Sequence, residues 1–212
     1  MSSISIIGLG NMARALGAIA LECGNTVQVI GRDAAKAADL AGALGGGAIA
    51  GTIGAALAGD IVILAVPYDS AAPIVRQYGD ALVGKVIVDI TNPFDRADFS
   101  GLVTPDGSSA AQEIAKAAPA GAHVVKAFNT VFGQVLAARK AGDRPLDVFI
   151  AGDDDGAKAH VSAFIESLGL RPLDTGGLKM AHWLEGAALV IMRLAIGQAV
   201  KGNFSLGIDI LG

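Results

Sequence analysis

Cysteine, histidine and charged residues are scarce in this sequence. Its 212 residues include one cysteine, Cys23, and three histidines, and only 17% of the residues are charged. A single cysteine excludes an intrachain disulfide framework and a thiolate metal cluster, and it favours a reducing compartment. Sixteen basic against twenty acidic residues give a net charge of −4, whereas nucleic acids and anionic membranes attract clustered basic charge. We therefore expect no metal site, no nucleic-acid or membrane partner, and a cytoplasmic location.

Long hydrophobic runs are also missing, although 52% of the residues are hydrophobic. The apolar run at residues 61–66 is far shorter than the roughly 20 residues that cross a bilayer. A second run, at residues 186–192, is closed on both sides by Glu185 and Arg193. The apolar residues are therefore expected in strands that are buried on both faces, or at a subunit interface.

Short apolar runs alternate with alanine-rich amphipathic stretches along most of the chain. The expected strands are residues 3–8, 26–31, 60–66, 85–90, 122–127, 146–151 and 170–174. The expected helices are residues 12–23, 34–44, 70–78, 110–117 and 157–168. Most of the strands lack polar alternation, which is typical of strands covered on both faces. This order predicts an α/β fold with a doubly wound, mostly parallel sheet.

The pattern changes after Gly176-Gly177. Residues 178–200 form one long predicted helix that is apolar almost all round between residues 186 and 192. Such a helix needs burial on every side, so we expect it to pack against a second copy of the chain in a homodimer. Residues 204–211 are expected to form a short strand or an extended tail. Earlier in the chain, Thr52 is a candidate cap for a short helix within residues 50–58.

A glycine-rich turn follows the first expected strand, in the order Gly8-Leu9-Gly10-Asn11-Met12-Ala13. This G-x-G-x-x-A pattern is typical of dinucleotide-binding folds when it joins a strand to a helix. Gly8 allows a tight turn, Gly10 lets the backbone approach a pyrophosphate, and Ala13 keeps the helix close to the strand. The free N–H groups at the helix start then meet the phosphates. The alternative is an ordinary glycine-rich turn of another α/β fold.

The end of the second expected strand indicates which dinucleotide binds. An NAD site places an acidic residue there to accept the ribose hydroxyls, but this chain has Gly31-Arg32-Asp33, with Lys36 one turn later. Gly31 leaves room for a phosphate, and Arg32 and Lys36 supply positive charge to bind it. We therefore expect NADP. Asp33 is either a displaced ribose ligand or a helix N-cap, and we favour the cap.

Several further stretches are distinctive. They are Ala65-Val66-Pro67, Ser109-Ala110-Ala111, Val125-Lys126-Ala127-Phe128-Asn129-Thr130, Gly152-Asp153-Asp154-Asp155, residues 169–178, Ile191-Met192-Arg193 and Leu206-Gly207-Ile208. Together with the glycine turn and Gly31-Arg32-Asp33, they make the chain resemble the NADPH-dependent F420 reductase family over nearly its whole length. The glycine turn alone is shared with pyrroline-carboxylate reductases and with the cytoplasmic domains of membrane metalloreductases.

The resemblance implies a Rossmann-type NADP-binding domain at residues 1–176. Residues 177–212 would then form a C-terminal helix and tail, acting as cleft wall and dimer interface. It also implies hydride transfer between NADP(H) and the deazaflavin coenzyme F420, or a related flavin-type acceptor. The implied NADP contacts are Leu9, Gly10, Asn11, Met12, Gly31, Arg32 and Lys36. Ala65-Val66-Pro67 would lie beside the nicotinamide ribose, while Asn92, Ala127, Phe128 and Asn129 would flank the nicotinamide. Some family members have histidine where this chain has Asn129.

Hydride transfer between two rings requires no nucleophile and no metal, because the cofactors carry the chemistry. The histidines His123, His160 and His182 are therefore expected to be structural or exposed. Lys126, at the end of a strand, is the candidate for contact with an anionic substrate group, and Asn129 is the other candidate positioning residue. The alternatives are a reductase of a small imine or carbonyl compound, and an NADP-binding redox sensor without turnover.

Overall fold

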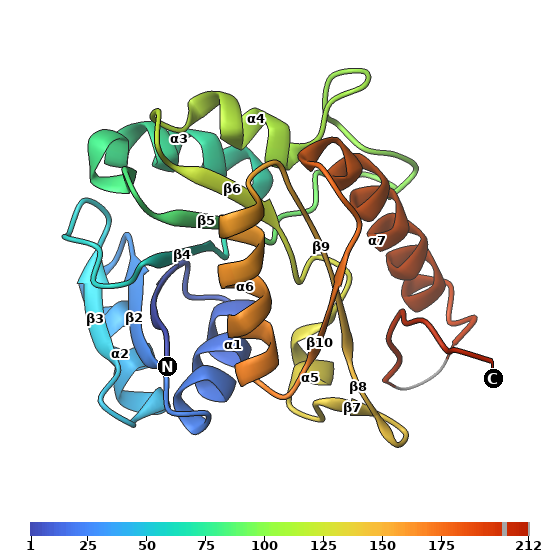
Figure 1. Ribbon diagram of the computed structural model, residues 1–212, viewed down its shortest axis with the longest axis horizontal. Helices are drawn as coiled ribbons and strands as arrows, with labels where there is room; N and C mark the ends of the chain where they lie inside the picture. The colour runs from blue at the N-terminus through green and yellow to red at the C-terminus, as the bar shows by residue number, and fades with distance from the viewer. Residues whose placement is uncertain (201–202, 212) are drawn as a thin grey trace.

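The computed structural model describes residues 1–200 and 203–211, and it shows an eight-stranded sheet between layers of helices (Figure 1). The strands of the sheet are β1 (Ser3–Ile7), β2 (Thr26–Gly31), β3 (Ile49–Thr52), β4 (Ile61–Leu64), β5 (Val86–Asp89), β6 (His123–Lys126), β9 (Asp147–Gly152) and β10 (Arg171–Asp174). The α-helices are α1 (Asn11–Glu22), α2 (Ala34–Leu44), α3 (Tyr68–Tyr78), α4 (Ala110–Ala117), α5 (Gly133–Leu136), α6 (Asp155–Ser167) and α7 (Ala181–Ile196). A short hairpin lies outside the sheet and consists of β7 (Lys140–Ala141) and β8 (Arg144–Pro145).

The strand order confirms a doubly wound, mostly parallel sheet. It runs β10-β9-β6-β5-β4-β1-β2-β3, and the six strands from β3 to β6 are parallel. The chain winds outward in one direction from β1 and in the other from β4, so β1 and β4 mark the switch point. Ligands of such sheets bind outside the carboxyl ends of the strands at this point. β9 pairs antiparallel with β6, and β10 continues parallel to β9.

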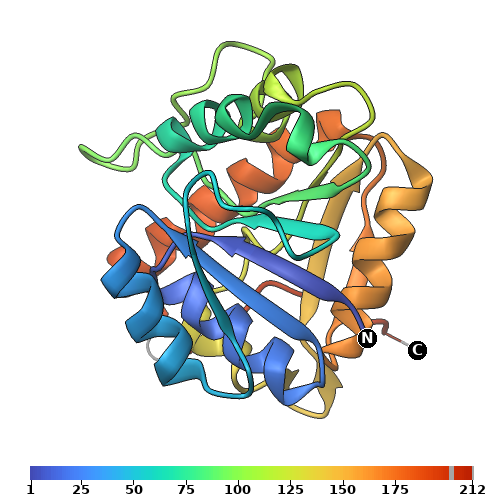
Figure 2. The ribbon, with the colours of Figure 1, turned by 90° about the vertical axis from the view of Figure 1, so that its left-hand side faces the viewer.

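Burial on both faces explains why the strands are continuous apolar runs. All four residues of β4 are buried, and so are the last five residues of β2. Helices α1, α2 and α6 pack on one face of the sheet, whereas α3, α4 and the beginning of α7 pack on the other. Figure 2 shows α3 and α4 on one side of the strands and α1 and α2 on the opposite side. Parallel sheets are almost always covered by helices on both faces.

Two expectations for local structure were wrong. Thr52 does not cap a helix, because residues 49–52 form β3. This strand pairs in parallel with β2 at the edge of the sheet, with Ile49 opposite Gln28 and Thr52 opposite Gly31. Residues 178–200 are not one helix either. A 3₁₀ turn at Leu178–Met180 precedes α7, and α7 ends at Ile196 before Gly197. Glycine commonly follows the last helical residue.

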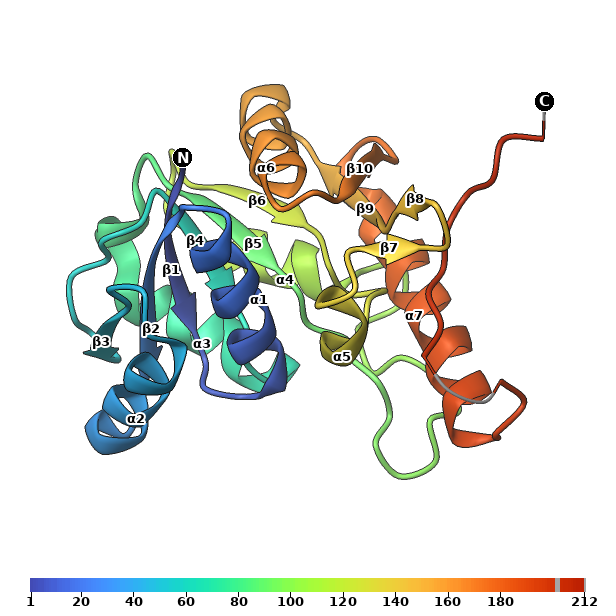
Figure 3. The ribbon, with the colours of Figure 1, turned by 90° about the horizontal axis from the view of Figure 1, so that it is seen from below.

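The tail after α7 is extended. This is one of the two conformations that the sequence predicted, the other being a short strand. Residues 203–211 contain no strand, and the tail runs outward past the β7–β8 hairpin towards the C-terminus (Figure 3). Its backbone is held at Ile208, whose N–H donates to Asp147 Oδ2 and whose carbonyl accepts from Arg171. In the described part of the chain, no helix has the length and apolar character needed to cross a bilayer.

Candidate functional site

The glycine turn lies at the carboxyl end of β1, at the switch point of the sheet. Gly8 has a φ of +129°, and a Cβ at this position would overlap the carbonyl oxygen of Ala65. Its N–H donates to Ile30 O at 2.8 Å, so this residue is fixed between two neighbouring strand ends. Gly10 differs, because a Cβ there would meet nothing within 4 Å. The backbone of Gly10 therefore borders open space at the start of α1.

The start of α1 is suited to an anion. Gly10 is the N-cap of α1, and no side chain among the residues that the structure describes caps this end of the helix. The first N–H groups of a helix are unsatisfied without a cap, and the helix dipole adds partial positive charge there. Asn11 is exposed in this first turn, whereas Ala13 is fully buried and packs towards the sheet, as the G-x-G-x-x-A pattern predicts.

The end of β2 and the first turn of α2 supply the two cations expected beside a dinucleotide. Arg32 and Lys36 are exposed, and neither forms an ion pair within the described residues. Asp33 is the N-cap of α2, because its Oδ1 accepts from the N–H groups of Ala35 at 2.9 Å and Lys36 at 3.1 Å. The interpretation of Asp33 as a cap is therefore confirmed.

Gly31 has a different role from the expected one. A Cβ on Gly31 would overlap the side chain of Leu9, so Leu9 already fills the space that the missing side chain leaves. The absence of a side chain at Gly31 instead allows the glycine turn to pack against the end of β2.

These residues surround one cleft with a volume of about 580 Å³. That volume lies within the range of about 300–1,000 Å³ that small-molecule sites have. The expected site residues in its lining are Gly8, Leu9, Gly10, Gly31, Arg32, Lys36, Ala65, Val66 and Pro67. Asp33 also lies in the lining, and residues that the sequence did not single out complete it, namely Ile7, Ile53, Asp69, Ser70, Pro73, Ile74 and Gln77. We call this the large cleft.

A second cavity of about 190 Å³ contains the other group of expected residues. The members of that group in its lining are Met12, Asn92, Phe128 and Asn129. Because Met12 follows Gly10 and Asn11 in α1, the small cavity lies near the helix start that borders the large cleft. Ala188 and Ile191 of α7 complete one wall. Ala127, which was expected to flank the nicotinamide, is fully buried in the core and is not part of this lining.

Two amide side chains are fixed against each other in the small cavity. Asn129 Nδ2 donates to Asn92 Oδ1 at 3.0 Å and to Leu184 O at 3.0 Å, and Asn92 Nδ2 donates to Asn129 O at 2.9 Å. Asn129 Oδ1 and Thr130 Oγ1 are buried and have no hydrogen-bond partner in the described structure. Buried polar atoms are nearly always paired, so these two are candidates for contact with a ligand.

The backbone beside this amide pair is strained. Phe128 is fully buried and has a φ of +58°, in the left-handed region that bulky residues rarely adopt. Such conformations cost about 1–3 kcal/mol and persist where the surrounding structure imposes them, often at functional sites. The strained residue connects the end of β6 to Asn129.

Lys126 is not available to a substrate, contrary to expectation. It is fully buried, and its ammonium group donates to Asp89 Oδ2 at 2.8 Å, Thr91 O at 2.6 Å and Glu185 Oε1 at 2.8 Å. An ammonium group has three N–H donors, so these bonds use all of them. Burial by itself lowers the pKa of Lys126, but Asp89 and Glu185 outweigh burial and hold it above its ordinary value.

Sequence reasoning missed the carboxylates that bind Lys126. Glu185 belongs to α7, and the sequence marked it only as the charged residue that closes the apolar run at residues 186–192. Its side chain is nevertheless buried, which raises its pKa. The only sequence signal was the position of Lys126 at the end of an apolar strand, where a buried charge needs partners. The histidines lie outside both cavities: His123 Nδ1 is 3.5 Å from Asp154 Oδ2, and His182 Nδ1 is 2.9 Å from Ser108 O.

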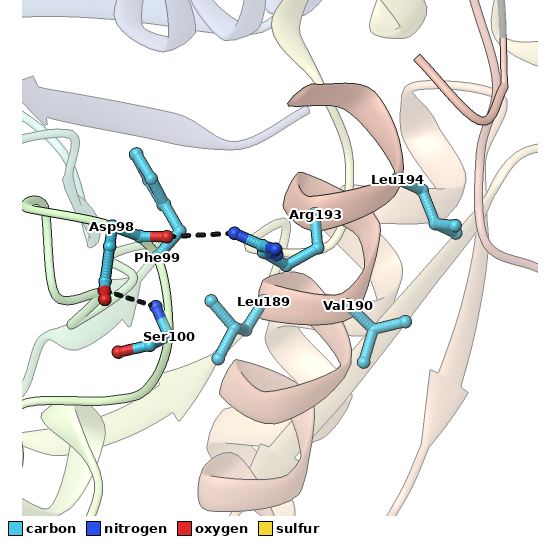
Figure 4. Close-up of a pocket in the computed structure, with 7 residues that line it drawn as sticks. All are labelled: Asp98, Phe99, Ser100, Leu189, Val190, Arg193 and Leu194. Atoms are coloured by element: carbon cyan, nitrogen blue, oxygen red, sulfur yellow. Dashed lines mark hydrogen bonds between the residues drawn. The ribbon is translucent and has the colours of Figure 1, made fainter. Parts of the chain in front are cut away.

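A third pocket, of about 670 Å³, lies between the loop at residues 98–100 and α7 (Figure 4). Arg193 Nη1 donates to Asp98 O at 3.0 Å across it, while Leu189, Val190 and Leu194 of α7 line its apolar side. None of the expected site residues contributes to this pocket. It borders the outer surface of α7 and is separate from the glycine turn.

Comparison with known proteins identifies the family of this chain. A family model described as NADP oxidoreductase, coenzyme F420-dependent, matches residues 3–93. The chain is also 32% identical over 156 residues to the F420-dependent NADP reductase of Methanocaldococcus jannaschii, covering 70% of this chain and 68% of that protein. The chain belongs to the F420-dependent NADP reductase family. The resemblance drawn from the sequence is thereby confirmed.

Solved structures share the fold of this F420-dependent NADP reductase family member. A protein of Sinorhizobium meliloti is 33% identical, with a TM-score of 0.78 over 86% of this chain and 88% of the other. A candidate F420-dependent NADP reductase of Arthrobacter sp. FB24 has a TM-score of 0.83 over 98% of this chain and 100% of the other, at 24% identity. All lining residues of the large cleft fall within residues 3–93, whereas Asn129 lies beyond them.

Proposed function

We propose that the protein is an NADP-dependent oxidoreductase that transfers hydride between NADP(H) and the deazaflavin coenzyme F420, or a related flavin-type acceptor. The observation that carries this proposal is the large cleft, which combines an uncapped helix start with Arg32 and Lys36 at the end of β2. Membership of the F420-dependent NADP reductase family supports the same reaction.

In the large cleft, the backbone from Leu9 to Met12 would bind the pyrophosphate at the N-terminus of α1. Arg32 and Lys36 would bind the additional phosphate of NADP, which distinguishes it from NAD. The turn Ala65-Val66-Pro67 would border the ribose next to the nicotinamide. Gly8 and Gly31 would not contact the charged phosphates of the cofactor. They let the strand ends approach closely enough to shape this cleft.

The small cavity, of about 190 Å³, would receive the nicotinamide, and the ring of the second substrate would stack against it at the cavity mouth. Its unpartnered Asn129 Oδ1 and Thr130 Oγ1 can accept N–H groups at a ring edge, and Phe128 and Phe132 provide apolar contact. When bound, the nicotinamide supplies the hydride or receives it. The protein's own residues orient the rings and exclude water, which is sufficient for transfer between two rings held face to face.

Anaerobic oxidation of NADPH tests the proposal. The acceptors to compare are F420, FMN, FAD, riboflavin and ferric chelates, with a cyclic imine and a small carbonyl compound included for the alternative reductase. We expect F420 or a flavin to be reduced fastest. Turnover of the imine or carbonyl alone would replace this proposal. Equal affinity for NADP and NADPH with no turnover of any acceptor would indicate a redox sensor.

We further propose that residues 1–176 form the NADP-binding domain and residues 177–212 a wall and dimer interface. Trp183 and Val190 on the outer surface of α7 are 67% and 60% exposed, which is unusual for large apolar side chains on one helix. A second copy of the chain would cover them in a homodimer. A cytoplasmic location completes the proposal, and the free thiol of Cys23 is consistent with it.

A further inference from the structure

Three buried charged side chains from separate elements meet beside the small cavity. Asp89 is the last residue of β5, Lys126 is the last residue of β6, and Glu185 lies in α7. Each side chain is 0% exposed, and Lys126 Nζ lies 2.8 Å from a carboxylate oxygen of each partner. We call these three residues the charged cluster. The hydride transfer proposed above does not use any of them.

Stability alone does not account for a cluster of this kind. Removing charges from water is costly, and buried ion pairs are often no more stabilising than apolar residues of similar volume. Their hydrogen bonds are directional, however, so they fix the relative positions of the elements that carry them. Glu185 Oε2 also accepts from Ala110 N at 3.2 Å, at the start of α4. The charged cluster therefore joins β5, β6, α4 and α7 at one point.

Each member of the charged cluster is close in sequence to a group that holds the Asn92–Asn129 pair. Asp89 Oδ1 accepts from Thr91 N at 2.8 Å, and Lys126 donates to Thr91 O, so both backbone groups of the residue before Asn92 are fixed. Glu185 follows Leu184, whose carbonyl accepts from Asn129 Nδ2. Lys126 lies three positions before Asn129, on the other side of the strained Phe128.

We propose that the charged cluster is a positioning device for hydride transfer. It fixes α7 against the carboxyl ends of β5 and β6, and thereby orients the Asn92–Asn129 pair so that Asn129 Oδ1 remains free to accept a ligand N–H. This role rests on the proposed function, because it assigns the small cavity to the reacting rings. The large cleft does not depend on it, since no member of the charged cluster lines that cleft.

The substitution Glu185→Gln tests the role, because it removes the charge and nearly preserves the shape. We expect kcat for NADPH oxidation to fall roughly tenfold to a hundredfold, the size of effect that small misplacements of reacting groups produce. The Kd for NADPH, measured by fluorescence titration, should be unchanged. Hydrogen–deuterium exchange should become faster in residues 127–133 and in α7, but not in α1.

The control is Ser5→Ala, which removes another fully buried polar side chain. Ser5 Oγ donates to Gln28 and accepts from Gly59 N, at the end of the sheet away from the small cavity. This variant should lower the thermal unfolding midpoint while leaving kcat and exchange in residues 127–133 unchanged. If Ser5→Ala and Glu185→Gln lower kcat equally, the charged cluster is merely structural and the proposal is wrong.

The remaining outcomes also decide between the two proposals. If Glu185→Gln does not fold, Glu185→Asp, which keeps the charge and shortens its reach, replaces it in every measurement. If neither variant folds, the charged cluster is a requirement for folding and the positioning role is overturned. If the wild-type protein turns over none of the acceptors, the proposed function fails. Faster exchange confined to residues 127–133 and α7 would still support the link between the charged cluster and the small cavity, whereas unchanged or uniform exchange would refute it.

Discussion

Two glycines of the same turn differ in the reason for their small size. Gly8 is required by the fold, because a Cβ there would overlap the carbonyl oxygen of Ala65 and its φ of +129° is unfavourable for other residues. Gly10 borders open space and has an ordinary extended backbone, so the fold does not require it. A ligand whose phosphates approach the start of α1 does require it. Within this turn, Gly8 is therefore needed for the fold, whereas Gly10 would be needed only for ligand binding.

Substitutions in this turn should separate stability from binding. Gly8→Ala is expected to lower the free energy of unfolding by roughly 1–3 kcal/mol, through overlap and backbone strain. Gly10→Val should leave the circular dichroism spectrum and the unfolding midpoint close to those of the wild type, but it should abolish NADPH binding in a fluorescence titration. Retained binding in Gly10→Val would mean that the pyrophosphate lies elsewhere.

Arg32 should determine the preference for NADP over NAD. Charged hydrogen bonds contribute on the order of 1.5–3 kcal/mol each. Arg32→Ala is therefore expected to weaken the affinity for NADPH roughly ten- to hundredfold. The affinity for NADH should hardly change, because it lacks the extra phosphate. Arg14→Ala is the matched control, since Arg14 is exposed in α1 and lines neither cavity. Equal losses for both nucleotides in Arg32→Ala would contradict the NADP assignment.

The residues of the glycine turn and of the end of β2 that line the large cleft were predictable, because G-x-G-x-x-A and the end of the second strand follow fixed spacings. Glu185 was not, because a glutamate within a helix is normally exposed, and no spacing connects it to strands 59 positions earlier. The amide pair was predicted only as separate residues. That Asn129 would leave one oxygen unpaired depends on where α7 packs, which local sequence does not encode.

Among the elements, the buried strands and the amphipathic helices α1, α2, α3, α4 and α6 were predicted closely, because continuous apolar runs and amphipathic spacing identify them. β3 was missed because it is an edge strand of four residues, none fully buried, so its sequence lacks the apolar run. The two-residue strands β7 and β8 are shorter than any periodic signal. The reversal of β9 relative to β6 follows from the path of the chain through α5 and this hairpin, rather than from composition.

The junction between β9, β10 and the C-terminal tail should depend on pH through Asp147. Its side chain is buried and binds Arg171 Nε at 2.5 Å and Ile208 N at 2.7 Å. Burial acts to raise the pKa of Asp147, but Arg171 and the N–H of Ile208 outweigh it and hold the pKa below its ordinary value of 3.8. The carboxylate therefore stabilises the folded chain above this pH, and the contribution is lost on acidification through its lowered pKa.

Asp147→Asn should consequently be less stable than the wild type at neutral pH. The difference in the free energy of unfolding should shrink as the pH falls below 3.8, since the wild-type carboxylate is then protonated too. Urea unfolding at a series of pH values on both sides of 3.8 measures this. A difference that stays constant over the whole series would show that the charge of Asp147 is not responsible.

At the scale of the whole molecule, the exposed apolar residues of α7 predict a dimer. Light scattering at micromolar concentration should give twice the mass of the 21.2 kDa chain. Val190→Glu should convert it to a monomer, because a charge in an apolar interface is left unpaired. Val83→Glu is the control, as Val83 is similarly exposed beyond the 3₁₀ turn at Gly79–Leu82. A monomeric wild-type protein would refute the interface.

The close approach of Gly8 to Ala65 would also affect how a dinucleotide enters the large cleft. The main chains that follow the neighbouring strands β1 and β4 approach each other closely here, so the floor beneath a bound dinucleotide would already be ordered before the ligand arrives. A preorganised floor avoids the entropy cost of ordering a loop on association. Exchange of oxidised for reduced cofactor would then require movement only at the rim, where the exposed guanidinium and ammonium groups follow β2 and begin α2.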